Sequence, residues 1–274
     1  MPRTLKELLA PVLGEKASRA VGAFDVIGDI AIIRIPDELM DSAGAIGEAL
    51  MKLNRNVRSV WAQVGPVEGD YRTRDLVHVA GERRSETIYK ENGCLFKLDV
   101  TKVFFTPRLS QERKRIAELV QDGEVIFNMF AGVGTYSIVI ARKKDATVHS
   151  SEINPYAYQY MLENIALNRL RGRVVPYLGD AADVARKLEG SVDRVLMPLP
   201  EKALQFFEHA LRTIRGRGTV HVYLHVRYEK GESARDAIER AKALIPQGEV
   251  VFYRAVREVG PRLVQAVYDV VITR

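Results

Sequence analysis

The part of the chain after Thr106 alternates strand-like and helix-like segments, and this alternation constrains the fold more than any other feature. Apolar runs of strand length, such as EVIFNMF, ATVHSS, RVLMPLP and TVHVYLHV, are separated by segments whose apolar residues recur at helical spacing. Consecutive strands joined by helices are connected by crossovers, and this arrangement builds a mainly parallel sheet with helices on both faces. We therefore predict an α/β domain over residues 106–274.

The preceding residues show a different pattern. Strand-like runs cover residues 24–35, 57–64 and 76–81, and one helix is expected over residues 37–53. The segment ETIYKENGCLFKLDV predicts a hairpin, because Asn-Gly between two strand-like runs is a strong turn signal. We predict a small α+β domain over residues 24–105, preceded by an N-terminal helix or extension over residues 1–23.

Composition excludes several classes of function. With 274 residues, 47% of them hydrophobic, the chain can bury a substantial core, and its net charge of +6 is compatible with an anionic partner. A single cysteine, Cys94, excludes an intramolecular disulfide and a cysteine-based zinc site, and is typical of a cytoplasmic protein. We find no signal peptide or membrane span, and the five histidines lack the spacing of metal ligands, so neither a membrane nor a metal is expected.

Three predicted strand ends carry the chemistry of a nucleoside site. FAGVG, with Gly132 and Gly134, lies between a strand and a helix, where glycines let the backbone approach a ligand. Glu152 ends the next strand, where a carboxylate can accept hydrogen bonds from ribose hydroxyls. Asp180 follows the third strand, where S-adenosylmethionine enzymes place an acidic group against the adenine amino group. The alternative is that the small residues only pack the helix on the strand.

The cofactor expected from this pattern is S-adenosylmethionine. A nicotinamide enzyme more often shows GxGxxG, whereas here Tyr136 and Ser137 follow the loop and the third glycine is missing. A nicotinamide oxidoreductase remains the small-molecule alternative.

Several motifs resemble those of the archaeal and eukaryotic tRNA (guanine-37 N1)-methyltransferases. They are KLDVTKVFFTPRLSQERKRIAELV, NMFAGVGTYS, EINPYAYQYMLENIALN, GDA, LMPLPEKA and GPRLVQAVYDV, in this order. The resemblance extends from about residue 24 to the C-terminus, and Thr106-Pro107-Arg108 resembles these methyltransferases rather than the wyosine-pathway aminocarboxypropyltransferases, which tend to read SPAN. It implies a Rossmann-like S-adenosylmethionine-dependent methyltransferase domain, a tRNA anticodon stem-loop as partner, and a monomer. The chain resembles the short form, which lacks an extra N-terminal tRNA-elbow domain.

The resemblance also implies roles for individual residues. Guanine N1 must lose a proton before it can attack a methyl group, and Arg108 is expected to stabilise the charge that develops on O6. Glu152 is expected to bind the cofactor, with the role of general base as the alternative. Expected cofactor contacts are Phe130, Ala131, Gly132, Gly134, Glu152, Ile153, Asp180, Ala181 and Pro198. Expected RNA contacts are Arg108, Arg113, Lys114, Arg115, Pro200 and Arg262.

Two positions depart from the family pattern. Asn128 stands where the family usually has aspartate, and Met197–Pro200 reads MPLP where the family has NLP, so Pro198 replaces an asparagine that helps to position the target base. The alternatives are therefore a wyosine-pathway enzyme, which methylates a tricyclic intermediate or transfers an aminocarboxypropyl group, and a noncatalytic tRNA-binding relative. Tyr71 is a candidate for stacking on an unstacked base, with a core or hinge role as the alternative.

Overall fold

The computed structural model describes residues 4–19, 24–69 and 73–274, and the chain divides into two compact units. The first unit holds Met1–Glu91 and Leu95–Pro107, and the second holds Asn92–Cys94 and Arg108–Arg274. The change of unit after Pro107 falls close to the boundary predicted after residue 105. Each unit has the fold class expected from the sequence pattern, α+β for the first and α/β for the second.

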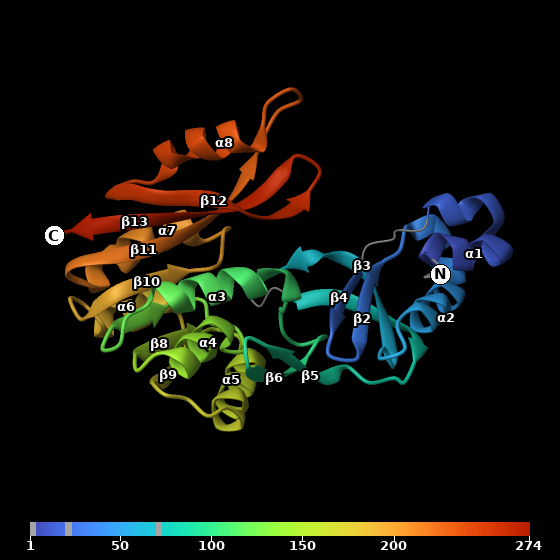
Figure 1. The fold of residues 1–274 in the computed structure, drawn as a ribbon, viewed down its shortest axis with the longest axis horizontal. Helices are drawn as coiled ribbons and strands as arrows, with labels where there is room; N and C mark the ends of the chain where they lie inside the picture. Colours follow the sequence, from blue (N-terminus) through green and yellow to red (C-terminus); the bar gives the residue numbers. More distant parts are fainter. Residues whose placement is uncertain (1–3, 20–23, 70–72) are drawn as a thin grey trace. The chain divides into compact units, whose positions relative to one another are not determined.

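A four-stranded sheet and two helices form the core of the first unit (Figure 1). The strands lie in the order β1 (Phe24–Ile27), β2 (Ile30–Arg34), β3 (Ser59–Glu68) and β4 (Thr73–Gly81). Between β2 and β3 the chain forms a crossover of η2 (Asp37–Ser42) and α2 (Ala43–Leu53), which lets β3 run parallel to β2.

The N-terminal helix belongs to this core. Helix α1 (Leu5–Leu13) is followed by η1 (Gly14–Arg19), and Leu5 and Leu9 are buried in the same apolar cluster as α2 and the sheet. Residues 4–19, which belong to the segment that the sequence pattern set apart as an extension, thus contribute side chains to the core of the first unit.

The predicted hairpin is formed by β5 (Glu86–Glu91) and β6 (Cys94–Asp99). Asn92 and Gly93 have φ angles of 48° and 76°. Positive φ at both central residues is the requirement of the tight turn that Asn-Gly favours.

The second unit is a seven-stranded sheet in the order β12-β13-β11-β10-β7-β8-β9. Its strands are β7 (Val125–Asn128), β8 (Thr147–Glu152), β9 (Arg173–Leu178), β10 (Val192–Met197), β11 (Ile214–Arg227), β12 (Glu249–Gly260) and β13 (Leu263–Thr273). The strands from β11 to β9 are parallel, whereas β13 runs antiparallel to both β11 and β12. The sheet is therefore mainly parallel, as predicted, with an antiparallel edge.

Helices alternate with the strands of this sheet along the chain, and the first of them precedes β7 (Figure 1). They are α3 (Ser110–Leu119), preceded by η3 (Pro107–Leu109), α4 (Thr135–Lys143), α5 (Pro155–Leu167), α6 (Ala181–Lys187), α7 (Ala203–Thr213) and α8 (Ala234–Ala241), with η4 (Lys242–Leu244) after α8. Helices α6, α7 and α8 share one buried apolar cluster with β10, β11 and β13. Helix α3 packs on α4, and α4 packs on β8.

Charged side chains are buried between α3 and the sheet. His221 on β11 and Asp269 on β13 are register partners, and Asp269 also accepts hydrogen bonds from Arg115 of α3, at 2.6 Å and 3.1 Å. On the other side of His221, Arg194 Nη1 lies 2.8 Å from His221 Nε2, and Arg194 Nε donates to Glu124 at 2.7 Å. These pairs link α3 to three strands of the sheet.

The partners of His221 determine its protonation. An arginine nitrogen can only donate, so Nε2 of His221 must accept from Arg194, and the ring proton sits on Nδ1, which donates to Asp269 Oδ1 at 2.6 Å. Burial lowers the pKa of His221, and the nearby Arg194 and Arg115 act in the same direction, although Asp269 opposes them. His221 is therefore neutral in the folded chain.

We expect the free energy of unfolding to decrease as the pH falls below about 6.5, by at most about 1.4 kcal/mol per pH unit from this residue. Above that pH the imidazole is neutral in both states; below it, the unfolded chain binds a proton that the folded chain does not, so acid favours unfolding. Urea unfolding at several pH values from about 7.5 to about 5 measures the free energy of unfolding. The same series on His221→Gln serves as the comparison. Burial also lowers the pKa of His149. His149 is present in both wild type and His221→Gln, so it contributes equally to the pH dependence of their stability. Equal pH dependence of the two proteins would contradict the prediction.

Candidate active site

Four loops meet at one edge of the larger sheet, because the carboxyl ends of its parallel strands all lie there. The glycine loop follows β7, Glu152 ends β8, and Asp180 and Pro198 follow β9 and β10. In the order β10-β7-β8-β9 these strand ends are neighbours, and the chain reverses its direction of travel across the sheet between β7 and β10. Such a switch point is where open α/β sheets bind ligands. The structure thus brings together the strand ends that the sequence singled out.

Glu152 joins the end of β8 to the glycine loop. Its Oε2 accepts a hydrogen bond from the Gly132 N–H at 2.6 Å, and its Oε1 accepts one from the Asn154 N–H at 2.8 Å. Burial raises the pKa of Glu152, although the backbone N–H groups of Asn154, Gly132 and Ile153 act in the opposite direction. Each carboxylate oxygen can accept a further hydrogen bond, so Glu152 can bind a ligand that presents two neighbouring hydroxyl groups.

Neighbouring elements fix the backbone of the glycine loop. The N–H of Ala131 donates to the carbonyl of Ser151 at 3.0 Å, and the buried side chain of Asn164 on α5 donates to the carbonyl of Val133 at 3.1 Å. Asn154 caps the start of α5 by accepting from the N–H of Tyr156, which explains the Asn-Pro pair after Glu152. The loop is therefore held in place before any ligand binds.

The two glycines of the loop serve different purposes. Gly132 and Gly134 both have positive φ, 57° and 88°. A Cβ on Gly134 would lie 3.0 Å from side-chain atoms of Ile138 and Met161, whereas no atom lies within 4 Å of a Cβ built on Gly132. Gly134 thus permits close packing of the loop on α4 and α5, and Gly132 borders open space.

At the end of β9, Asp180 caps helix α6 by accepting from the Ala182 N–H at 2.7 Å. Beside it, Ile153 is 42% exposed and Leu178 is 54% exposed. Leu178 is the register partner of Glu152, so these apolar side chains flank the adjoining ends of β8 and β9. An acceptor at a strand end that also carries exposed apolar side chains suits a flat heterocycle with an amino group.

Beyond β10 lie Pro198 and Pro200, both half-buried. Arg262 is exposed in the turn between β12 and β13 with a φ of 53°. Because Leu263 pairs with Arg227 at the end of β11, this turn lies at the same edge as the loop after β10. Among the other residues predicted at the site, Phe130 packs against Phe206, and Ala131 and Ala181 are buried.

Arg108 is exposed at the start of α3. One helical turn later, the buried Glu112 accepts a hydrogen bond from the Tyr223 hydroxyl at 2.9 Å. The Tyr223 ring lies 6.2 Å from the ring of Tyr136 in the first turn of α4. The amino ends of α3 and α4 are therefore close together, so Arg108 belongs to the same end of the unit as the glycine loop.

The prediction of a surface cluster for RNA at residues 113–115 is wrong for Arg113 and Arg115. Arg113 is 2% exposed, and the Arg115 guanidinium is bound by Glu112 and Asp269 and lies 4.8 Å from the centre of the Phe252 ring. The basic run lies on a helix that packs on the sheet, so Arg113 is buried and Arg115 binds carboxylates there. Lys114 points outward, 3.9 Å from Glu118.

Sequence reasoning missed the polar groups that come together only in the folded chain. Glu112 holds Tyr223, Arg115 and Arg254, and Glu201 lies 3.6 Å from His225. The EINP and glycine motifs can be identified from a few consecutive residues. The partners of Glu112 and Glu201, by contrast, lie far away in the sequence. Their only local signal is a polar residue inside an apolar strand or helix face, as in TVHVYLHV.

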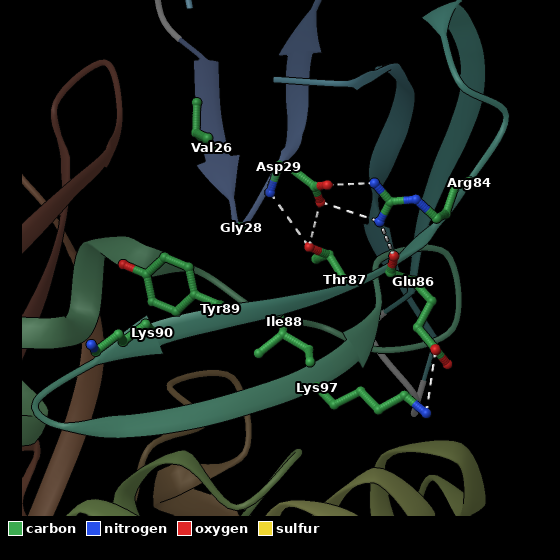
Figure 2. Close-up of a pocket in the computed structure, with 10 residues that line it drawn as sticks. All are labelled: Val26, Gly28, Asp29, Arg84, Glu86, Thr87, Ile88, Tyr89, Lys90 and Lys97. Atoms are coloured by element: carbon green, nitrogen blue, oxygen red, sulfur yellow. Dashed lines mark hydrogen bonds and ion pairs between the residues drawn. The ribbon is translucent and has the colours of Figure 1, made fainter. Parts of the chain in front are cut away.

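The first unit has an open cleft of about 780 Å³ between the β1–β2 turn and β5 (Figure 2). On its wall, Asp29 is bonded to Arg84 and to the Thr87 hydroxyl, at 3.2 Å and 2.7 Å. Lys97 is paired with Glu86 at 3.3 Å. Asp29, Arg84 and Thr87 are thus bonded to one another, and these bonds attach the β1–β2 turn to the start of β5. Tyr71 lies outside the described residues.

Two further observations concern the described residues. No group of three or more His, Cys, Asp or Glu side chains among them is arranged to hold a metal ion. Within the same residues, the helices are too short or too polar to cross a membrane.

Family models match both units. Residues 87–251 match the TRM5/TYW2 methyltransferase domain, and residues 5–84 match the TYW2 N-terminal domain. The chain belongs to the TRM5/TYW2 methyltransferase family. The family expected from the sequence motifs is therefore confirmed.

Relatives within the family differ in activity. The tRNA (guanine(37)-N(1))-methyltransferase Trm5b of Pyrococcus abyssi is 48% identical over 201 residues, which are 73% of this chain and 59% of that protein. The tRNA 4-demethylwyosine(37)-methyltransferase Taw21 of Saccharolobus solfataricus is 39% identical over 251 residues, 90% of this chain and 92% of that protein. The match thus spans well under two thirds of the first relative and nearly all of the second.

Solved structures of the family are similar in fold. The structure of aTrm5 in complex with tRNALeu has a TM-score of 0.85 and 31% identity, covering 100% of this chain and 79% of that one. The structure of Methanocaldococcus jannaschii TYW2 in complex with AdoMet has a TM-score of 0.63 and 27% identity, covering 92% of this chain and 100% of that one. The fold of this chain is therefore that of the family.

We expect Gly134→Ala to lower the free energy of unfolding by about 2 to 3 kcal/mol and Gly132→Ala by about 1 kcal/mol. Both variants force a side chain into positive φ, but only at Gly134 does the new Cβ meet neighbouring side chains. Urea unfolding of the two variants measures the difference. Equal losses would contradict the different purposes assigned to the two glycines.

Proposed function

We propose that this chain, acting as a monomer, transfers a methyl group from S-adenosylmethionine to N1 of guanosine 37 in the anticodon loop of tRNA. The observation that carries the proposal is the set of strand ends at one edge, where Glu152 is bonded to the glycine loop and Asp180 lies on the next strand end. Membership of the TRM5/TYW2 family supports the same chemistry.

The strand ends fit this cofactor part by part. The open space at Gly132 admits a ligand beside the loop, and Glu152 offers acceptors for the ribose hydroxyls. Asp180 offers an acceptor for the adenine amino group, and the exposed Ile153 and Leu178 offer apolar cover for the ring. When bound, S-adenosylmethionine supplies an electrophilic methyl group.

Two groups near the start of α3 suit the activation of the target guanine. Arg108 stabilises the negative charge that develops on guanine O6 as N1 loses its proton. For the proton itself there are two candidate carboxylates, Glu152 and Glu112. We assign the ribose to Glu152, which is bonded to the glycine loop, and the proton to Glu112, which lies one helical turn from Arg108 beside the Tyr223 hydroxyl.

RNA contacts are proposed for Arg108, Lys114, Pro200 and Arg262. Lys114 and Arg262 are exposed cations at two different elements, which suits contact with phosphate groups, and such binding weakens with salt. Pro200 belongs to the loop after β10, beside the edge where the base must reach the cofactor.

Methylation of 4-demethylwyosine is the second candidate function. It is favoured by the match to Taw21, which covers 92% of that relative, and by Pro198 in place of the amide that helps to position guanine in the methyltransferases that this chain resembles. A tRNA that already carries the tricyclic base would then be the substrate.

The test is mass spectrometry of nucleosides from tRNA incubated with the protein and S-adenosylmethionine. With a transcript that carries guanosine at position 37, we expect 1-methylguanosine. A methyl group gained only by tRNA that carries 4-demethylwyosine would favour the second candidate. No methylation of either tRNA would contradict both and leave an aminocarboxypropyltransferase, which would add that group to the tricyclic base, or a noncatalytic tRNA-binding relative.

We expect Asp180→Asn to weaken the binding of S-adenosylmethionine by about 1 to 3 kcal/mol without loss of stability. Asparagine caps a helix as well as aspartate does, so its carbonyl oxygen keeps the cap of α6, but the NH2 group that replaces the second carboxylate oxygen cannot accept a hydrogen bond from the adenine amino group. Calorimetry measures the affinity, and Asp183→Asn, on the same helix, is the matched control. Equal affinities for the two variants would restrict Asp180 to its capping role.

We expect Arg108→Ala to slow single-turnover methyl transfer by about a hundredfold or more while the affinity for S-adenosylmethionine stays within about twofold of wild type. Arg108→Lys should restore only part of the rate, because an ammonium group lacks the planar fork of the guanidinium. The alternative is a salt bridge between the units. In that case the alanine variant loses thermal stability, and its folded fraction transfers methyl groups at the normal rate.

A further inference from the structure

The loop after β10 holds a carboxylate beside an imidazole. Oε1 of Glu201 lies 3.6 Å from Nδ1 of His225. Glu201 directly follows Pro200, and His225 lies on β11 beyond Val222, which is the register partner of Met197 at the end of β10. The pair therefore stands at the carboxyl edge of the sheet, just past the last residue of β10.

Glu201 is the first polar side chain after β10, since Met197–Pro200 reads MPLP. Its side chain is 46% exposed, whereas that of His225 is 23% exposed. A hydrogen bond from the Lys202 N–H to the Leu199 carbonyl, at 3.0 Å, closes the turn that presents Glu201. The imidazole thus lies beside a carboxylate whose side chain is still partly exposed.

The order of the strands places the target base near this pair. If adenine lies at Asp180 after β9 and ribose at Glu152 after β8, the methionine portion of the cofactor lies at the glycine loop after β7. The next strand in that direction is β10, followed by β11. A base that approaches the methyl group from outside the cofactor site therefore meets the loop after β10 first. This step rests on the proposed function.

The chemistry of the pair selects a particular group on the base. A carboxylate only accepts hydrogen bonds, and the donors on the pairing edge of guanine are N1–H and the 2-amino group. N1 must face the methyl group, so the 2-amino group is the donor that remains for Glu201. In a tricyclic wyosine intermediate that nitrogen is part of the third ring, and adenine has no 2-amino group.

We propose that Glu201, held in place by His225, accepts a hydrogen bond from the 2-amino group of the target guanine and thereby makes the site specific for guanosine. The pair supplies the polar contact to the base that Pro198 cannot make. Glu201 is a specificity-determining residue in this account, and His225 is a positioning residue that acts through it.

Inosine provides the test, because it differs from guanosine only by the missing 2-amino group. Single-turnover kcat/KM is measured on tRNA transcripts with guanosine or inosine at position 37, for wild type, Glu201→Ala and the control Glu208→Ala, an exposed glutamate on α7. We expect wild type and the control to prefer guanosine by at least about tenfold, and Glu201→Ala to lose most of this preference. His225→Asn should lose part of it. Any intrinsic difference between the two bases is common to all variants.

The outcomes separate this inference from the function on which it rests. If wild type makes 1-methylguanosine and Glu201→Ala prefers guanosine as strongly as wild type does, the role of Glu201 is wrong and the proposed function stands. The role of Glu201 is also wrong, and the proposed function also stands, if wild type methylates guanosine and inosine with equal kcat/KM. If wild type methylates neither transcript, both the role of Glu201 and the proposed methylation of guanosine 37 are wrong. A general loss of rate in Glu201→Ala with an unchanged preference would mean that the pair only supports the loop.

Discussion

The hydrogen bond between Glu152 and the Gly132 N–H is the contact on which the candidate site depends. It joins two strand ends that are twenty residues apart in the sequence and adjacent in the sheet. The register of β7 with β8 and of β8 with β9 brings the glycine loop, Glu152 and Asp180 to one edge, and the backbone bond from Ala131 to Ser151 fixes the loop there. The chemistry of the edge follows from this geometry, since each strand end offers a different group to the same ligand.

The edge divides into two halves with different chemistry. The ends of β7, β8 and β9 offer backbone, carboxylate and apolar surfaces that suit a nucleoside cofactor. The ends of β10 and β11 and the start of α3 offer the carboxylates Glu201 and Glu112 and the cation Arg108. Because the switch point lies between β7 and β10, the two halves meet where, in the proposed reaction, a methyl group passes from cofactor to base. The relatives Trm5b and Taw21 carry different substrate names, and the second half of the edge is where such a difference can arise.

Local signals in the sequence were sufficient for most of the fold and for the placement of the glycine loop, Glu152 and Asp180 at adjacent strand ends. The alternation of apolar runs predicts the parallel sheet, Asn92-Gly93 predicts the hairpin turn, and the glycine loop and Glu152 follow from their places at strand ends. The internal charges were not predictable in this way. His221 and Asp269 are 48 residues apart, and Glu112 and Tyr223 are 111 residues apart. Arg115 looks like a surface cation in the sequence because the carboxylate of Asp269 that receives it lies on the last strand of the sheet.

Glu152 and Glu112 are assigned different roles, cofactor binding and proton removal, and one pair of variants separates these roles. Glu152→Gln and Glu112→Gln are compared by calorimetry with S-adenosylmethionine and by single-turnover methylation of tRNA with guanosine at position 37, after thermal unfolding has established the folded fraction. We expect Glu152→Gln to weaken cofactor binding by at least about tenfold. We expect Glu112→Gln to keep the affinity and to slow methyl transfer by about a hundredfold or more. Unchanged cofactor affinity in Glu152→Gln, together with a normal rate in Glu112→Gln, would contradict the account.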